Sequence, residues 1–220
     1  EEQEDPEILL PEDWKMLMTS LNDPSAREIY RYAKNRGFTD GLLWRFRCGY
    51  SYNRKWSRRL LMPSFDCEGN LNYLTGRAID SNNWLRYVNE SLPKQKIIFN
   101  EIDLDFTKPL ILVEGPLDLI KCPPNSTCLL GSSLNENSIL FYKIVKNKTP
   151  VVLLLDTDAK QKAMKIAKLL SSYSIDVKLN FPHDGDIGDC TKPQVEHLIT
   201  KSVDYSYGSL ITTKIQELKR

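Results

Sequence analysis

The sequence predicts an α/β protein in which a mainly parallel sheet occupies the second half of the chain. Short runs of Val, Leu and Ile recur there without polar alternation, and amphipathic segments with helical spacing separate them. Unbroken apolar runs are typical of strands that are covered on both faces. Strands that alternate with helices are joined by right-handed crossovers, which makes neighbouring strands parallel. The first half lacks this alternation, and we expect a small mixed α+β subdomain there.

Strands and helices are expected to alternate through the second half. The expected elements are strands 110–114, 127–131, 151–155 and 175–180, and helices 136–147 and 159–172. In the second helix the apolar residues have the i, i+3, i+4, i+7 spacing of a buried face, as at Ala163, Ile166, Ala167 and Leu170. The lysines of this helix fall largely on other faces: Lys160, Lys162, Lys165 and Lys168. We expect a solvated lysine face, although a lysine stripe beside a nucleic-acid channel could also steer DNA.

The first half begins with segments that have helical character. Residues 11–35 are predicted to be helical, and the clearest helix starts near Asp23, has Pro24 at its first position and ends at Gly37. A second, short helix is expected to follow, with Thr39 as its N-terminal cap. This part of the chain therefore predicts two helices before any strand.

Strand-like sequence follows these helices. Residues 58–80 form two apolar runs around a turn at Gly69 and Asn70, so they predict a hairpin. Another strand is expected near 96–99. The tryptophans are interpreted as core or hydrophobic-patch residues rather than base-stacking residues: Trp14, Trp44, Trp56 and Trp84.

Composition limits the class of protein. Lys and Arg total 30 against 29 Asp and Glu, so the net charge of +1 gives no global sign of a nucleic-acid partner. No apolar stretch approaches the roughly 20 residues of a membrane span, and the acidic start does not resemble a signal peptide. Five cysteines without paired CxxC spacing predict reduced thiols rather than a zinc site. We therefore expect a cytoplasmic globular protein without zinc and without a membrane partner.

Acidic side chains follow three of the expected strands at the point where each strand ends. Glu114 ends the first strand, and Asp156 and Asp158 follow the third. The last strand is followed by a third acidic cluster: Asp184, Asp186 and Asp189. Ligands of open α/β sheets bind outside the carboxyl ends of the strands, and carboxylate oxygens suit a hard divalent cation. A helix-capping role would explain Asp158 alone, so the pattern predicts a cation site at this edge of the sheet.

The ordered motifs E-G-x-x-D at 114–118, D-x-D at 156–158 and D-x-x-D at 186–189, with LLGSSL between the first two, resemble the Toprim domain. Bacterial-type primases, topoisomerases and some nucleases share this domain, which has a Rossmann-like, mainly parallel sheet. The resemblance covers about residues 108–192. It implies that Glu114 is a general acid/base or metal-linked glutamate and that Asp156 and Asp158 are the principal metal ligands. Asp186 and Asp189 would complete the metal site.

Two acids of the motifs are left with alternatives. Asp118 matches the second acid of the first motif, but it could instead only hold the site together. In the third cluster, DGDIGD, Asp184 remains an alternative to Asp186. The sequence also departs from the family, which often has Gly where this chain has Thr157 and Gln161. Neither residue is a ligand, so we expect metal binding to survive while the turn and the approach of a phosphate differ.

The first half carries a second resemblance, through segments 36–51, 57–80, 86–90 and 97–103. In order, these segments resemble the N-terminal subdomain of the RNA polymerase core of DnaG-type primases, and phage primases above all. The resemblance implies that Arg58 or Arg59, together with Arg77, lines a basic cleft facing the metals. Residues expected nearby are Asn89, Lys94 and Lys96. The predicted parts are a lead-in at 1–22, a basic subdomain at 23–107, a Toprim subdomain at 108–192 and a helical tail at 193–220.

These resemblances imply a DNA-templated RNA primase that makes short primers on single-stranded DNA from NTPs, with Mg²⁺ or Mn²⁺, in a bacterial or phage-infected cell. A replicative helicase would be contacted through regions beyond this core. Rival interpretations are a Toprim nuclease that admits water in place of a 3′-hydroxyl, and an inactive Toprim module that binds nucleic acid. A topoisomerase fragment is disfavoured, since no catalytic-tyrosine domain fits in 220 residues. His183 and His197 are expected to be exposed rather than ligands or bases.

Overall fold

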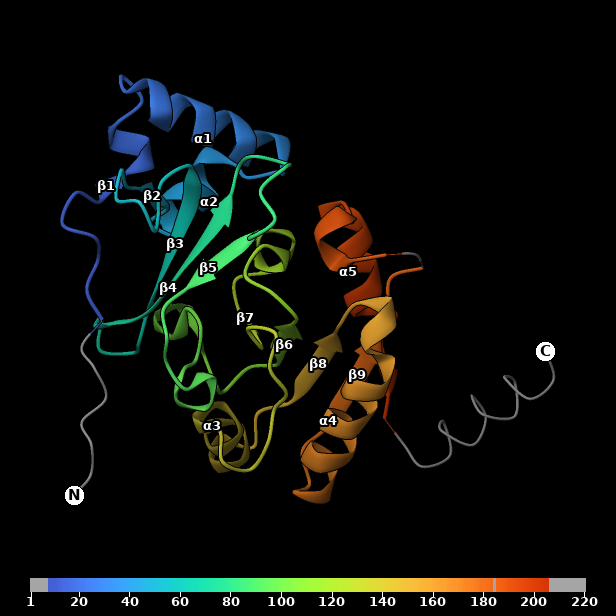
Figure 1. The fold of residues 1–220 in the computed structure, drawn as a ribbon. Helices are drawn as coiled ribbons and strands as arrows, with labels where there is room; N and C mark the ends of the chain where they lie inside the picture. The colour runs from blue at the N-terminus through green and yellow to red at the C-terminus, as the bar shows by residue number, and fades with distance from the viewer. Residues whose placement is uncertain (1–7, 184, 206–220) are drawn as a thin grey trace, which may run out of the picture. The chain divides into compact units, whose positions relative to one another are not determined.

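The fold is described by a computed structural model that covers residues 8–183 and 185–205 (Figure 1). The chain divides into two compact units, Glu1–Pro93 with Phe99–Ile102 and Lys94–Ile98 with Asp103–Arg220. Each unit is built on a five-stranded sheet, and the sheet of the second unit is mainly parallel. The predicted α/β class is confirmed.

The first unit is an antiparallel sheet with two helices. Its strands, in sheet order, are β1 Lys15–Met16, β2 Gly49–Tyr50, β3 Arg59–Phe65, β4 Leu71–Ala78 and β5 Tyr87–Asn89. Its helices are a 3-10 turn Leu17–Thr19, α1 Pro24–Asn35 and α2 Asp40–Arg45. The predicted hairpin is confirmed, because β3 and β4 pair in antiparallel fashion. In its turn the Asp66 carboxylate accepts hydrogen bonds from the backbone N–H groups of Glu68 and Asn70, and Gly69 adopts a φ of 90°.

Both predicted helix starts are confirmed by their caps. Asp23 accepts a hydrogen bond from Ser25 N at 2.8 Å with Pro24 at the first helical position, and Thr39 accepts one from Leu42 N at 3.2 Å. These bonds satisfy backbone donors that have no partner inside the helix. The caps therefore fix where α1 and α2 begin.

Two predictions for this half of the chain were wrong. The segment before Asp23 is not a continuous helix, because Lys15 and Met16 pair with β2 and Asp13 accepts hydrogen bonds from Ser51 Oγ at 2.5 Å and Tyr52 N at 2.7 Å. These partners are far away in sequence, so local periodicity could not show them. The predicted strand at 96–99 is also absent, because Lys96 ends the 3-10 turn Lys94–Lys96 and residues 97–99 are irregular.

Gly49 in β2 lies tightly against the first strand. A Cβ at this position would overlap the Trp14 indole nitrogen and come within 2.7 Å of the Lys15 carbonyl oxygen. We expect Gly49→Ala to lower the free energy of unfolding by about 3 kcal/mol, measured by denaturant unfolding, because overpacking strains the backbone. Gly41→Ala in α2 is the control, since its Cβ would meet Thr39 Oγ1 at an ordinary 3.8 Å. Equal stability of the Gly49 variant and the wild type would contradict this packing of β1 on β2.

The second unit has the alternating order that its sequence predicts. Its sheet order is β10 Val203–Asp204, β9 Val177–Asn180, β8 Val151–Leu154, β6 Leu110–Val113 and β7 Ser126–Cys128. Its helices are α3 Ile139–Asn147, α4 Lys160–Ser172 and α5 Lys192–Thr200. Short 3-10 turns are Lys94–Lys96, Glu101–Asp103, Asp118–Lys121, Thr157–Ala159 and Ile187–Asp189, of which Glu101–Asp103 straddles the two units. β6 to β9 pair in parallel, whereas β10 adds an antiparallel edge.

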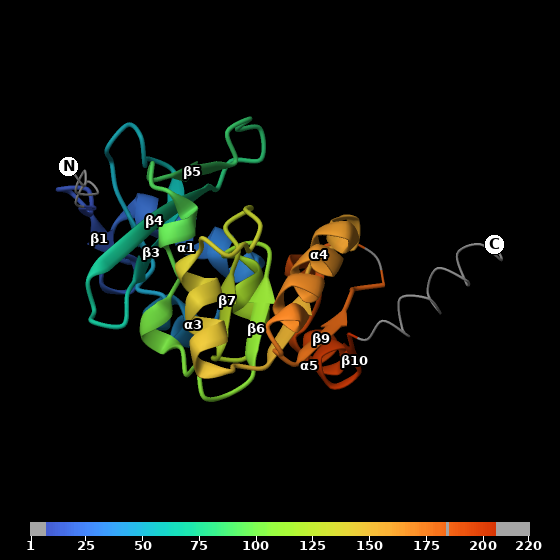
Figure 2. The same cartoon turned by 90° about the horizontal axis from the view of Figure 1, so that it is seen from below.

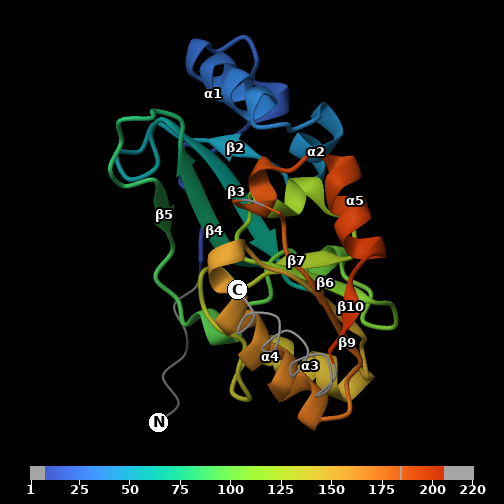
Figure 3. The same cartoon turned by 90° about the vertical axis from the view of Figure 1, so that its right-hand side faces the viewer.

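Helices cover both faces of this sheet. Figures 2 and 3 show α3 and α4 on one face, and Figure 3 shows α5 on the other. The first face holds a core in which Leu112, Leu153 and Val177 of the strands are buried with Ile144 of α3 and Ile166 of α4. Alternate strand residues point to the opposite face, so the central strands β6 and β8, which are buried throughout, are apolar on both sides. This arrangement leaves the carboxyl ends of the strands as the place for polar side chains.

The C-terminal part contains an element that the sequence did not predict. α5 is capped by Thr191, and β10 then pairs Val203 with Leu179 of β9. Residues 206–220 of the predicted helical tail lie outside the described residues, and the four-part division of the chain stays a prediction. Among the described helices, none is long and apolar enough to cross a membrane.

Candidate metal centre

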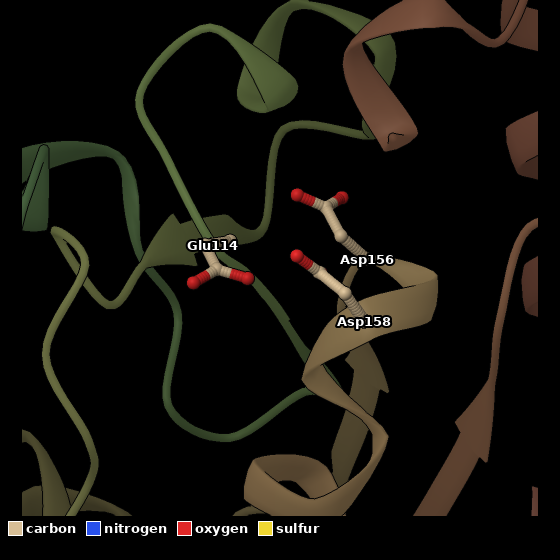
Figure 4. A group of neighbouring side chains, drawn as sticks. All are labelled: Glu114, Asp156 and Asp158. Atoms are coloured by element: carbon tan, nitrogen blue, oxygen red, sulfur yellow. The ribbon is translucent and has the colours of Figure 1, made fainter. Parts of the chain in front are cut away.

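Three carboxylates meet where the central strands of the second unit end. Glu114 directly follows β6, and Asp156 follows its parallel neighbour β8 by two residues. Asp158 lies in the 3-10 turn that leads into α4. The three side chains each offer a ligand oxygen, and these atoms all lie within 4.8 Å of one another. Figure 4 shows the carboxylates turned toward a shared space. The structure thus brings together three of the five predicted metal ligands.

The D-x-D turn is held in place by the loop after β9. Asp156 Oδ1 accepts a hydrogen bond from Ile187 N at 3.0 Å. Thr157 Oγ1 donates at 3.2 Å towards the carbonyl oxygens of Pro182 and Gly185. The threonine therefore replaces the glycine common in this motif with a side chain that ties the two loops together.

The third acidic cluster lies beside this group but is not part of it. Asp186 precedes the 3-10 turn Ile187–Asp189 and Asp189 ends it, and both are exposed. Neither belongs to the described carboxylates whose oxygens lie within 4.8 Å of one another. The charge of Asp186 is close enough to raise the pKa of Asp156. The metal-binding role of Asp186 and Asp189 stays a prediction, and Asp184 lies outside the described residues.

Asp118 is the most buried acid near the site. Its side-chain Oδ2 accepts a hydrogen bond from Gly115 N at 2.8 Å, and the residue is 9% exposed. Burial raises its pKa to about 7, against the hydrogen bond from Gly115, and the negative charges of Asp156, Asp186 and Glu114 add to this rise. The contact with Gly115 fits the interpretation that Asp118 holds the turn after Glu114.

The charges of the site favour a bound cation. Burial raises the pKa of Asp156 to about 6, while the Ile187 N–H opposes this and the charges of Asp186, Glu114 and Asp158 contribute to it. Like charges held this close disfavour ionisation unless a positive charge compensates them. Three carboxylates with oxygens within 4.8 Å fit Mg²⁺ or Mn²⁺, which bind oxygen ligands. The donor set is therefore that of a hard divalent cation.

Lys162 of α4 also contacts this site. Its Nζ lies 2.8 Å from Glu114 Oε1, and the two side chains are 22% and 29% exposed. A pocket of about 470 Å³ adjoins the ion pair, and its lining residues are Glu114, Ser133, Asp158, Ala159, Gln161, Lys162 and Lys165. The prediction of a solvated lysine face was therefore wrong for Lys162. Its signal in the sequence was its place one helical turn after Asp158.

The predicted nucleic-acid residues of the first unit mostly have partners within that unit. Arg58 pairs with Asp80 at 2.7 Å and with Glu28 at 2.8 Å, and Arg59 is buried and donates to the Leu85 carbonyl oxygen at 2.9 Å. Two other side chains are also engaged: the Arg77 guanidinium lies 4.6 Å from the Tyr87 ring centroid and Asn89 Oδ1 accepts from Thr75 Oγ1 at 2.7 Å. A nucleic-acid role for these residues stays a prediction.

The two predicted lysines of this group belong to the second unit. Lys94 and Lys96 lie in one 3-10 turn, and Lys94 Nζ donates to the Leu130 carbonyl oxygen at 2.6 Å.

The tryptophans differ from one another in burial. Trp56 is buried as predicted, whereas Trp84 is 90% exposed and lies outside any core. Trp44 is 48% exposed.

Comparison with known proteins identifies the architecture. The sequence matches no family model and no curated protein. Solved structures that resemble the chain include the zinc-binding and RNA polymerase domains of the Aquifex aeolicus primase, with a TM-score of 0.73 and 21% identity over 91% of this chain and 61% of that one. The E. coli primase catalytic core gives 0.68 and 16% identity over 84% and 76%.

A third structure, the DnaG primase catalytic domain bound to single-stranded DNA, gives a TM-score of 0.69 with 16% identity over 84% of this chain and 75% of that one. The chain therefore spans about three fifths of the Aquifex structure and about three quarters of the two catalytic cores. These matches cover 84% to 91% of this chain, so they extend over parts of both units. The chain has the fold of the catalytic core of DnaG-type primases.

Proposed function

We propose that this chain is the catalytic core of a DNA-templated RNA primase, which joins NTPs into short primers on single-stranded DNA. The observation that carries the proposal is the convergence of Glu114, Asp156 and Asp158, with ligand oxygens within 4.8 Å of one another, in a chain with the primase-core fold. A Toprim-like fold alone would also suit a nuclease. The antiparallel first unit of the same chain favours a primase, because the matches to primase cores cover 84% of this chain and so extend beyond the second unit.

The chemistry needs the residues that the site holds. A divalent ion bound by these carboxylates would lower the pKa of a 3′-hydroxyl and neutralise charge on the leaving pyrophosphate. Asp156 and Asp158 would hold the ion, with Asp156 oriented by its hydrogen bond from Ile187 N. Glu114 would bind the ion or take a proton, and Asp118 would fix the turn that carries Glu114. The residues of the chain would therefore position the ion and supply the negative charge that binds it.

The template and the nucleotides would be bound by cationic side chains. Arginine offers planar donors to phosphates, and we propose Arg77 for this role with Asn89, Lys94 and Lys96. Arg58 and Arg59 would serve mainly to hold the first unit together, since their guanidinium groups already bind acidic or carbonyl partners. A replicative helicase would be bound by regions other than this core. The protein would act in the cytoplasm of a bacterial or phage-infected cell.

The test is primer synthesis on single-stranded DNA with labelled NTPs and Mg²⁺ or Mn²⁺. The primase proposal expects short RNA products that require the metal and the template. Metal-dependent cutting of DNA or RNA without NTPs would favour the nuclease. DNA binding that survives Asp156→Ala, with neither activity in the wild type, would favour an inactive binding module. Each result therefore selects one of the three functions.

A further inference from the structure

The ion pair between Lys162 and Glu114 would compete with metal binding, because Glu114 is also a candidate metal ligand. Lys162 Nζ lies 2.8 Å from Glu114 Oε1, and both side chains are partly buried. Glu114 shares the site with Asp156 and Asp158. The ammonium therefore places a positive charge beside the acidic group. A divalent cation bound by Glu114 would repel it at short range.

The surroundings of Lys162 offer a second place for its ammonium. Lys165 lies three residues further along α4, so it is a neighbour on the same helix surface. Lys165, Ser133 and Gln161 line the adjoining pocket of about 470 Å³ together with Glu114 and Asp158. Two ammonium groups, a hydroxyl and an amide beside a metal site are suitable donors for phosphate oxygens. A lysine can change partner readily because its charge is compact and its stem is flexible.

We infer that Lys162 exchanges partners when the metal binds. It pairs with Glu114 in the metal-free protein, and a divalent cation on Glu114, Asp156 and Asp158 releases it into the pocket, where with Lys165 it binds the phosphates of an incoming nucleotide. The inference rests on the proposed function for the identity of that nucleotide. Metal and phosphate then bind cooperatively, since each favours the same position of Lys162.

The test uses Lys162→Met with Lys168→Met as its matched control. Lys168 lies on the same helix, is exposed and does not line the pocket. Calorimetric titration with Mn²⁺ alone should show about tenfold tighter binding to the Lys162 variant, because a competing charge is lost. Titration with inorganic pyrophosphate at saturating Mn²⁺ should show about tenfold weaker binding, because a charged hydrogen-bond donor is lost. The Lys168 variant should match the wild type in both titrations.

A second substitution, Lys162→Arg, keeps the charge and the hydrogen-bond donors for phosphate oxygens and should retain both affinities to within about threefold. Unchanged or weaker Mn²⁺ binding by Lys162→Met would show that Lys162 does not compete with the metal, and unchanged pyrophosphate binding would show that it does not reach phosphate. Either result overturns the inference. Both titrations omit DNA, so a wild type that binds Mn²⁺ and pyrophosphate as expected but makes no primer counts against the primase proposal alone.

Discussion

Asp156→Asn is expected to lower primer synthesis on the order of a thousandfold, or about 4 kcal/mol in transition-state free energy. Asp156 lies in the group of three carboxylates and is the one whose pKa is raised to about 6, by burial first and by its acidic neighbours in addition. Asparagine removes its charge as a metal ligand but keeps an oxygen that can accept the hydrogen bond from Ile187 N. The loss should therefore be one of metal binding and not of folding. Rate measurements over a range of Mg²⁺ and Mn²⁺ concentrations check it.

A control for this substitution lies at the opposite end of the sheet. Asp176 is exposed, and its backbone carbonyl accepts a hydrogen bond from Val151 N, at the start of β8. Asp176→Asn changes net charge by the same amount and should leave synthesis within about twofold. Denaturant unfolding in EDTA should find Asp156→Asn at least as stable as the wild type, because the substitution removes a charge that burial disfavours. Primer synthesis at the wild-type rate in the Asp156 variant would contradict a metal-binding role for this carboxylate.

The site could be predicted from the sequence where it depends on how strands end. The apolar runs before Glu114 and Asp156 are parallel neighbours in the sheet, so their carboxyl ends had to meet. The same reasoning could not decide the third cluster, since Asp186 and Asp189 lie on a loop rather than at a strand end. Strand ends follow from periodicity, whereas the path of a loop does not.

Residues with distant partners could not be predicted in this way. Lys162 belongs to a helix whose buried face was predicted correctly, but periodicity does not tell which flanking side chain reaches an acid 48 residues earlier in the chain. Short strands cannot be predicted from the sequence for a related reason. β1 has two residues and is held beside β2 by the contact of Asp13 with Ser51 and Tyr52. Trp84 was interpreted from its residue type, yet its loop leaves it 90% exposed.

Asp118→Asn is expected to stabilise the metal-free protein at alkaline pH. Burial raises the pKa of this carboxyl to about 7, whereas an unfolded chain ionises it near its ordinary value of about 3.9. As pH rises from about 4 to about 7, the unfolded state loses its proton first, so the free energy of unfolding falls and stays low above pH 7. Asparagine cannot ionise, and its side-chain oxygen can still accept the hydrogen bond from Gly115 N. The variant therefore avoids this loss.

The expected gain near pH 8 is roughly 2 kcal/mol, about half of what the full pKa shift would give, because the neighbouring carboxylates titrate together with Asp118. Denaturant unfolding in EDTA should show the gain shrinking as the pH is lowered towards about 3, where both states are largely protonated. Equal stability of variant and wild type near pH 8 would contradict a costly buried charge. Destabilisation would show that the ionised carboxylate is needed by Gly115.

The same variant decides between the two roles of Asp118 that the motif leaves open. If Asp118 only holds the turn after Glu114, Mn²⁺ affinity should stay within about threefold of the wild type, because asparagine preserves that contact. If Asp118 is itself a ligand, affinity should fall by more than about tenfold. A stabilised protein with intact Mn²⁺ binding would mean that the side-chain oxygen at position 118 holds the turn after Glu114, and that the buried charge is not needed for metal binding.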